Sequence, residues 1–199
     1  TVSIGMLLGY PACCTKHYMS VNKKYDIAST PYFLWDRVLH SYWNTKGTPS
    51  FYLNKIYFGE PYYLIFHFPC SYDCKKSIAI AKKTLALMES EDPLFAQKIV
   101  SRLKLPALYS AYSTLFFKGQ VFHGNKILYS GVYECTRPGI TSWFDLVAFR
   151  KGNLVEILKG KIKIFRDQQL INELNMPEKF VLFNGEKKNS ESCIANALS

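Results

Sequence analysis

Four of the six cysteines lie in two short segments, a grouping typical of a metal or thiol site. Cys13 and Cys14 belong to the segment GYPACCTKHY, and Cys70 and Cys74 belong to HFPCSYDCKKS. Each pair follows a proline where a helix is expected to begin, and a helix N-terminus favours the thiolate that binds metals. If the two helix starts face each other, they bring three or four thiolates to one place.

A histidine follows the first cysteine pair at helical spacing. His17 lies four residues after Cys13 and three after Cys14, so its side chain lies near that of each cysteine on a helix. The sequence therefore adds the His17 imidazole to the candidate metal ligands.

Further candidates surround the second cysteine pair. His67 precedes Cys70 by three residues and is a candidate catalytic base or ligand, although a lone histidine is commonly a hydrogen-bonded core residue. Asp73 is a candidate catalytic residue, or a partner that orients a ligand, with a helix cap as the plain alternative. Tyr10 and Tyr72 lie beside the cysteines in the two segments and are expected to wall a pocket, unless they belong to the aromatic core.

The donor set fits either a tetrahedral zinc site or a cubane iron–sulfur cluster. The spacing is not C-x₂-C, so it matches no standard zinc finger, zinc ribbon or ferredoxin. Neighbouring side chains on a helix diverge by about 100°, so we do not expect Cys13 and Cys14 to bind one zinc ion together. Either one of them stays outside the coordination sphere, or the site holds a cluster large enough for both. Redox-active thiols, a disulfide between the segments, and buried unligated cysteines are the alternatives.

The chain carries a large positive charge. Its 199 residues include 25 Lys and Arg against 15 Asp and Glu, a formal net charge of +10. Such a surplus attracts anions, so an anionic small molecule or a nucleic acid is the expected partner. The lysines occur as pairs along the chain, which is typical of solvated helix faces and turns. Nucleic-acid binding therefore requires that folding gathers them on one face.

Several function classes lack their motifs. The sequence has no G-x-G-x-x-G, Walker loop, G-x-S-x-G, H-E-x-x-H or EF-hand loop. No uncharged apolar run is long enough for a transmembrane helix, and the N-terminus lacks the basic lead-in of a signal peptide. We therefore expect a cytoplasmic protein without a transmembrane segment.

The first half of the chain is expected to be helical and to position both cysteine pairs. We expect a helix opening near Pro11, an amphipathic helix over 30–44, a helix over 71–90 capped by Ser71 or Asp73, and a helix over 93–104. The aromatic run 50–68 is broken in its middle by Gly-Glu-Pro. It forms either two short strands or irregular segments.

After residue 106 the pattern changes to strands and tight turns. Residues 107–117 fit either a helix or a strand, and 120–134 alternate around Gly124-Asn125 as a hairpin does. Residues 143–165 repeat this pattern and are predicted as strands. Residues 166–174 are predicted as a short helix or loop, and 179–186 as a last strand.

The order of elements predicts an α+β fold in one domain over residues 1–185. A helical, cysteine-bearing part (1–105) is expected to pack on a β-rich part (106–185), which forms a small barrel or a twisted antiparallel sheet. The polar tail 186–199 lies outside this domain. Cys135 reaches the cysteine site only if the sheet folds over the helices, and Cys193 belongs to the tail.

The two cysteine segments resemble those of an uncharacterised prokaryotic family, a domain of unknown function found in archaea and bacteria. The family shares G-Y-P-x-C-C near the start of the chain and H-x-P-C-S-x-x-C in the middle, followed by a turn-rich β segment. In this chain the motifs are residues 9–14 and 67–74. The resemblance implies no reaction, but it implies that five residues belong together: Cys13, Cys14, His67, Cys70 and Cys74. His17 lies outside that pattern.

These observations lead to three hypotheses. The first is a metal- or iron–sulfur-dependent enzyme that acts on an anionic substrate, with the two cysteine pairs at the metal and His67 beside it. The second is a basic module that binds nucleic acid or an acidic protein and contains a structural zinc. The third is a thiol redox protein without metal. An open coordination position distinguishes the first from the second, because catalytic zinc sites keep one and structural sites do not.

Overall fold

The computed structural model describes residues 4–25, 33–55, 62–109, 113–122, 125–136, 146–158, 160–175 and 181–183. The chain divides into two compact units. The first comprises 1–55 and 61–103 and is helical, and the second comprises 56–60 and 104–199 and is β-rich. The protein therefore has the predicted α+β fold, and the two parts meet close to the expected position in the chain. That they form one domain stays a prediction.

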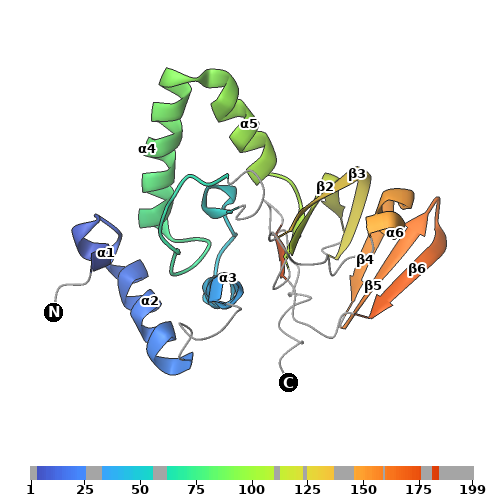
Figure 1. Cartoon of the computed structure of the whole chain (residues 1–199), viewed down its shortest axis with the longest axis horizontal. Coiled ribbons are helices and arrows are strands. Elements are labelled where there is room, and N and C mark those ends of the chain that lie inside the picture. The colour runs from blue at the N-terminus through green and yellow to red at the C-terminus, as the bar shows by residue number, and fades with distance from the viewer. Residues whose placement is uncertain are drawn as a thin grey trace. The chain divides into compact units, whose positions relative to one another are not determined.

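Helices α1 to α5 build the described part of the helical unit (Figure 1). They are α1 (Ile4–Leu7), α2 (Ala12–Tyr25), α3 (Phe33–Trp43), α4 (Lys75–Glu91) and α5 (Pro93–Leu103), with the 3₁₀ helix η2 (Phe51–Leu53) between α3 and α4. The four predicted helices are confirmed, although residues 26–32, with the expected start of the second, lie outside the described residues. The described residues of the run 50–68 form η2 and irregular segments instead of two strands.

Helix α4 begins later than predicted. Its N-cap is Cys74, so neither Ser71 nor Asp73 caps it. Both side chains are engaged elsewhere, because Ser71 Oγ donates to Asp73 Oδ1 (2.5 Å) and the Gly47 N–H donates to Asp73 Oδ2 (2.6 Å). The buried positions of α4 recur every four residues, as one helix face requires: Ser77, Ala81 and Leu85.

An antiparallel sheet forms the β-rich unit. Its strands are β1 (Ala107–Tyr109), β2 (Ser113–Phe122), β3 (Lys126–Thr136), β4 (Leu154–Leu158), β5 (Lys161–Arg166), β6 (Gln169–Asn175) and β7 (Val181–Phe183). The order across the sheet is β6-β5-β4-β3-β2-β1-β7, with neighbouring strands antiparallel. In the described residues, the edge strands β6 and β7 do not pair with each other. The sheet is therefore open, and the barrel alternative is wrong.

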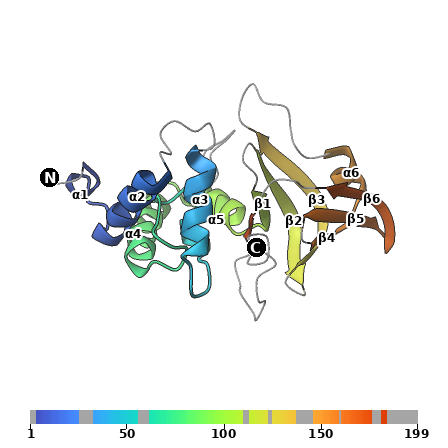
Figure 2. The same cartoon turned by 90° about the horizontal axis from the view of Figure 1, so that it is seen from below.

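Two segments of the β-rich unit differ from the prediction. Part of the predicted strand region 143–165 is helix α6 (Leu146–Lys151), which lies beside the sheet and contacts β3 and β5 (Figure 2). The helix buries Ala148 and Phe149, and so short an apolar run fits a helical turn as well as a strand. Residues 166–174, predicted as a short helix or loop, belong mainly to β6. Backbone pairing with β5 overrides the polar composition of this edge strand.

The core of the β-rich unit lies between α6 and one face of the sheet. Alternate residues of β4 and β5 are buried, as the two-residue period of a strand requires. The rings of Phe117 and Phe149 meet in this core with centroids 6.0 Å apart. The Tyr129 hydroxyl donates to the Phe149 carbonyl oxygen (2.8 Å), and burial raises the pKa of Tyr129 to about 12.

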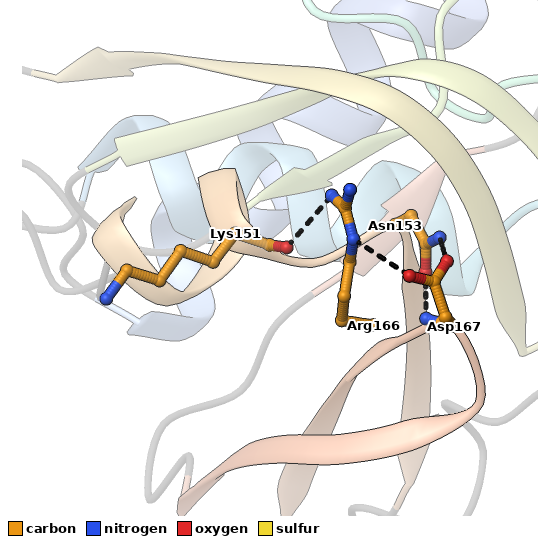
Figure 3. Close-up of polar contacts among 4 residues, drawn as sticks. All are labelled: Lys151, Asn153, Arg166 and Asp167. Atoms are coloured by element: carbon orange, nitrogen blue, oxygen red, sulfur yellow. Dashed lines mark hydrogen bonds and ion pairs between the residues drawn. The ribbon is translucent and has the colours of Figure 1, made fainter.

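A tight turn joins β5 to β6 and places two ordinary residues in the left-handed region. Asp167 and Gln168 have φ angles of 49° and 70°, which favour glycine. Figure 3 shows the contacts that hold the turn: Asn153 Nδ2 donates to Asp167 Oδ1 (2.8 Å), and the Asp167 N–H donates to Asn153 Oδ1 (3.1 Å). Arg166 Nε donates to Asp167 Oδ2 (3.2 Å), and its Nη1 donates to the Lys151 carbonyl oxygen (3.3 Å). These exposed contacts partly offset the backbone strain.

Candidate metal centre

Four cysteine sulfurs lie together in the helical unit. The sulfurs of Cys13, Cys14, Cys70 and Cys74 all lie within 4.8 Å of one another. The Cys14 sulfur is 3.9 Å from that of Cys13 and 3.8 Å from that of Cys74, and the Cys13 and Cys74 sulfurs are 3.9 Å apart. The predicted cysteine group is therefore formed, and it could bind a metal ion.

The N-terminal ends of α2 and α4 bring the sulfurs together, and Figure 1 shows these two helices near each other. Cys13 and Cys14 lie in the first turn of α2, and Cys74 is the N-cap of α4. Cys70 lies directly before the turn that leads into α4, which is closed by a hydrogen bond from the Cys74 N–H to the Ser71 carbonyl oxygen (3.2 Å). Cys70 and Cys74 thus converge through a turn, and not through the shared helix face that their spacing suggests. The positive ends of two helix dipoles lie near the thiols and favour thiolates.

The adjacent residues Cys13 and Cys14 converge, contrary to the expectation that neighbouring side chains on a helix point apart. Their sulfurs are 3.9 Å apart. The Cα–Cβ bonds do diverge by about 100°, but rotation about χ1 moves each sulfur between staggered positions. Both sulfurs reach the same neighbour, Cys74. The vicinal spacing therefore does not exclude a single ion bound by both residues.

Hydrogen bonds surround the buried sulfur of Cys14. The Cys70 N–H donates to Cys14 Sγ (3.3 Å), and Ser77 Oγ lies 3.2 Å from the same sulfur. Ser77 is fully buried, and its Oγ is also 2.8 Å from His67 Nε2. A chain of contacts thus runs from His67 through Ser77 to Cys14. Contacts of this kind orient metal ligands and set their basicity.

Burial and hydrogen bonding shift the thiol pKa values in opposite directions. Burial raises the pKa of Cys14 to about 11, against the lowering effect of its bonds to Ser77 and to the Cys70 backbone. Burial and the neighbouring thiols raise the pKa of Cys70. Burial also disfavours the Cys74 thiolate, but contacts with the Ser77 hydroxyl and backbone outweigh it and lower the pKa of Cys74. A bound metal cation offsets the cost of burying these thiolates, because thiols that coordinate a metal are deprotonated.

His67 lies beside the sulfurs and is joined to them through Ser77. It is buried, and its ring centroid is 5.0 Å from that of Tyr10. Burial, followed by the charge of Lys55, lowers the pKa of His67 to about 4. The imidazole is therefore neutral at neutral pH. Its predicted role as a base or ligand stays a prediction.

The remaining predicted ligand, His17, lies on α2 outside the group of close sulfurs. The described residues that could share one metal ion are the four cysteines, and His17 is not among them. Burial, followed by the charge of Arg37, lowers the pKa of His17.

Asp73 holds the turn that carries Cys70 and Cys74. Its carboxylate accepts hydrogen bonds from the Ser71 hydroxyl and the Gly47 N–H. Burial opposes ionisation of Asp73, but these hydrogen bonds prevail and lower its pKa. The structure thus gives Asp73 a positioning function, and its predicted catalytic role stays a prediction.

A cleft of about 570 Å³ lies beside the sulfurs, and Cys14 forms part of its wall. The residues that line it come from 4–19, which include α1 and the first part of α2, and from the segment 66–68. Tyr10, predicted as a pocket wall, is one of the residues that line it. Tyr72 is buried in the core instead, with its N–H donating to Thr45 Oγ1 (2.8 Å).

Two residues of this region are missed by the sequence analysis. Ser77 lies three residues after Cys74, a spacing that could have shown a hydroxyl on the same helix turn as the sulfur. Lys55 lies in an aromatic run where nothing indicates burial. Its Nζ donates to the Phe66 carbonyl oxygen (2.9 Å) and lies 5.0 Å from the centroid of the Phe68 ring, and burial lowers the pKa of Lys55 to about 7.

Comparison of the chain with protein-family models, curated proteins and solved structures gave no match. The resemblance of the two cysteine segments to an uncharacterised prokaryotic family therefore stays an expectation. None of the described helices is long and apolar enough to span a membrane.

Proposed function

We propose that this chain is a zinc-binding protein in which Cys13, Cys14, Cys70 and Cys74 hold one tetrahedral ion. The observation that carries the proposal is the spacing of the sulfurs, which is 3.8–3.9 Å for three of the pairs. Four sulfurs at about 2.3 Å from a central zinc ion stand about 3.8 Å apart, along the edges of a tetrahedron. A cubane cluster places iron and sulfide between its cysteine sulfurs, which then stand farther apart. The spacing favours a single ion.

The four thiolates fill every position of a tetrahedral ion. Catalytic zinc sites keep one position for water or substrate, whereas structural sites do not. We therefore favour a structural ion over a catalytic one. The ion joins Cys13 to Cys74, which are 61 positions apart in the chain, and so ties α2 to α4. Such a cross-link restricts the unfolded chain and stabilises the helical unit.

The surroundings of the four sulfurs suit the charge of this complex. Zinc with four thiolates carries two negative charges, and the N-terminal ends of α2 and α4 each contribute about half a positive charge. Lys16, Lys75 and Lys76 are exposed and lie close to the cysteines in sequence. These positive charges stabilise the zinc-bound form of the site. The exposed lysines remain solvated when no zinc is bound.

Two lysine pairs on α4 support the second hypothesis, a binding module with a structural zinc. Lys75 and Lys76 are exposed, and the pair recurs seven residues later as Lys82 and Lys83, also exposed. A seven-residue repeat returns to nearly the same side of a helix, so the four lysines share one side of α4. Such a row of charges suits the phosphates of a nucleic acid. Binding that weakens steeply as salt rises, and that is lost in Lys82→Glu with Lys83→Glu, would support it.

Cobalt(II) substitution tests the metal site. Cobalt bound by four thiolates in a tetrahedron absorbs strongly in the visible range, whereas six-coordinate cobalt absorbs weakly. We expect one cobalt per chain, displaced by zinc, with the strong tetrahedral spectrum. Replacing any of the four cysteines by serine should weaken metal binding and change the spectrum. The matched control Cys135→Ser on β3 should change neither the affinity nor the spectrum. A weak six-coordinate spectrum, or a spectrum that Cys70→Ser leaves intact, would contradict the proposal.

A further inference from the structure

Apart from the sulfur of Cys14, which belongs to the metal centre, the described residues that line the neighbouring cleft have no charged side chain. Its walls are mainly aromatic and aliphatic, and its volume of about 570 Å³ falls in the range of small-molecule sites. An anionic substrate, which the net charge of the chain suggests, would find no counter-charge here. The chemistry of the walls selects an uncharged ligand.

Two pairs of aromatic rings line this cleft. The rings of Tyr10 and His67 lie 5.0 Å apart between centroids at an angle of 35°, and those of Tyr18 and Phe68 lie 6.3 Å apart at 22°. The guanidinium of Arg37 stacks on Tyr18, with Cζ 4.1 Å from the ring centroid. The stacking restricts this ring before any ligand arrives. Flat, preorganised rings favour a planar aromatic ligand over a flexible chain.

Large apolar side chains at this cleft are exposed to water. Leu8 is 62 % exposed and Phe66 is 74 % exposed, and both line the cleft. Exposed apolar groups around a hollow mark a binding site, because burying them against a ligand removes apolar surface from water.

A buried hydroxyl in the wall lacks a hydrogen-bond partner among the described residues. Thr15 is only 8 % exposed and lines the cleft, and its Oγ1 is unpartnered. Buried hydroxyls are nearly always paired, so an unpaired one points to a missing partner. Gly5 borders the same space, where a side-chain carbon would lie 3.0 Å from Thr15 Oγ1. Glycine at position 5 therefore lets α1 pass close to this hydroxyl.

We propose that this cleft binds an uncharged planar aromatic molecule, with a hydroxyl, amine or amide group of the ligand paired to Thr15 Oγ1. The ligand lies between the Tyr10–His67 and Tyr18–Phe68 walls. Because Cys14 forms part of the same wall, the ligand also lies next to the metal centre. The site goes beyond the proposed structural zinc and does not depend on it, and metal content is measured separately from ligand binding.

Fluorescence titration with N-phenyl-1-naphthylamine tests this site in the metal-loaded chain. This neutral probe has two aromatic groups and one N–H donor, and it becomes bright in apolar surroundings. We expect saturable binding of one probe per chain. The matched variants are Leu8→Ser, at the cleft, and Leu7→Ser, which is 75 % exposed but does not line the cleft. We expect Leu8→Ser to weaken binding about tenfold, because it removes apolar contact with the ligand, and Leu7→Ser to change it less than twofold.

Thr15→Val tests the polar contact, because it replaces the hydroxyl by a methyl group of similar size. It should weaken N-phenyl-1-naphthylamine about fivefold and should not weaken 1-phenylnaphthalene, which has no hydrogen-bonding group. Equal losses of probe affinity in Leu7→Ser and Leu8→Ser would show that the probe binds to the exposed surface of α1, and this result would overturn the proposal. Absence of saturable binding to folded protein, or stronger competition by decanol than by 1-naphthol, would overturn it as well.

Discussion

Replacing Ser77 by alanine tests whether the contacts around Cys14 support a metal. Ser77 is fully buried, and its Oγ lies 3.2 Å from Cys14 Sγ and 2.8 Å from His67 Nε2. The substitution removes one hydrogen-bond partner from a thiolate ligand and leaves the His67 nitrogen buried without that partner. The change is small in volume, so it perturbs the helix α4 little.

The magnitude follows from the type of bond lost. A hydrogen bond to a charged group contributes about 1.5–3 kcal/mol, and about 1.4 kcal/mol corresponds to a factor of ten in affinity. Ser77→Ala should therefore lower the zinc affinity about 10- to 100-fold, the range typical of residues that support metal ligands. The matched control is Ser90→Ala on the same helix, where the exposed hydroxyl donates to the Leu87 carbonyl oxygen (2.7 Å). It should change the affinity less than twofold.

The assay is competition for zinc with a chromophoric chelator under anaerobic conditions. Urea unfolding of the metal-free variants separates a loss of metal affinity from a loss of fold. An affinity of Ser77→Ala within twofold of the wild type would refute the reasoning. An equal loss of zinc affinity in Ser90→Ala would refute it as well, because the loss would then come from any serine-to-alanine change in α4 and not from the contact with Cys14.

Three further substitutions test the fold and the buried charge. Gln168→Gly should stabilise the β-rich unit by about 0.5–1 kcal/mol in urea unfolding, because Gln168 has a φ of 70°. The same change at the extended residue Gln169 should destabilise it. Phe117→Ala should cost about 3–5 kcal/mol in the same assay, because Phe117 is fully buried in the core against α6 and the sheet. A cost below about 1 kcal/mol would contradict that core. Burial lowers the pKa of Lys55 to about 7, so the unfolded chain binds this proton more tightly and stability should rise with pH between about 7 and 10. Lys55→Met should reduce this rise in the free energy of unfolding by about 1–3 kcal/mol. If the variant and the wild type show the same pH dependence of unfolding, Lys55 does not lose its charge by burial in the folded chain.

The parts of the fold that have strong local patterns were predictable. The helix over 71–90 has apolar residues at helical spacing, and α4 occupies most of it. The hairpin of β2 and β3 follows from alternation on both sides of Gly124-Asn125, with Phe122 paired to Lys126. In both cases the sequence period matches the geometry of the element, so no distant contact is needed to specify it.

The predictions that were wrong concern segments whose structure depends on contacts with residues distant in the sequence. Helix α6 is a single apolar turn whose buried face is defined by the sheet against which it packs. Strand β6 is mostly exposed and polar, and its pairing with β5 makes it a strand. Local propensity does not contain this information.

In the candidate site, too, some features were predictable from local sequence and others depend on distant contacts. The four cysteines were recognisable from their types and spacing, and the structure brings their sulfurs within 4.8 Å of one another. The convergence of Cys13 and Cys14 was not predictable, because it depends on the position of Cys74 from a distant segment. The apolar cleft was also hidden, since its walls come from residues 4–19 and 66–68. Only the folded chain places these residues side by side.

Metal analysis of protein purified without oxygen tests the central claim most directly. Elemental analysis and native mass spectrometry of the untagged chain should find one zinc per chain in a colourless protein, and serine at the four cysteines should abolish it. Iron with sulfide and a brown colour would contradict the single-ion proposal in favour of a cluster. Thiols that titrate fully in a metal-free, stably folded protein would contradict metal binding itself.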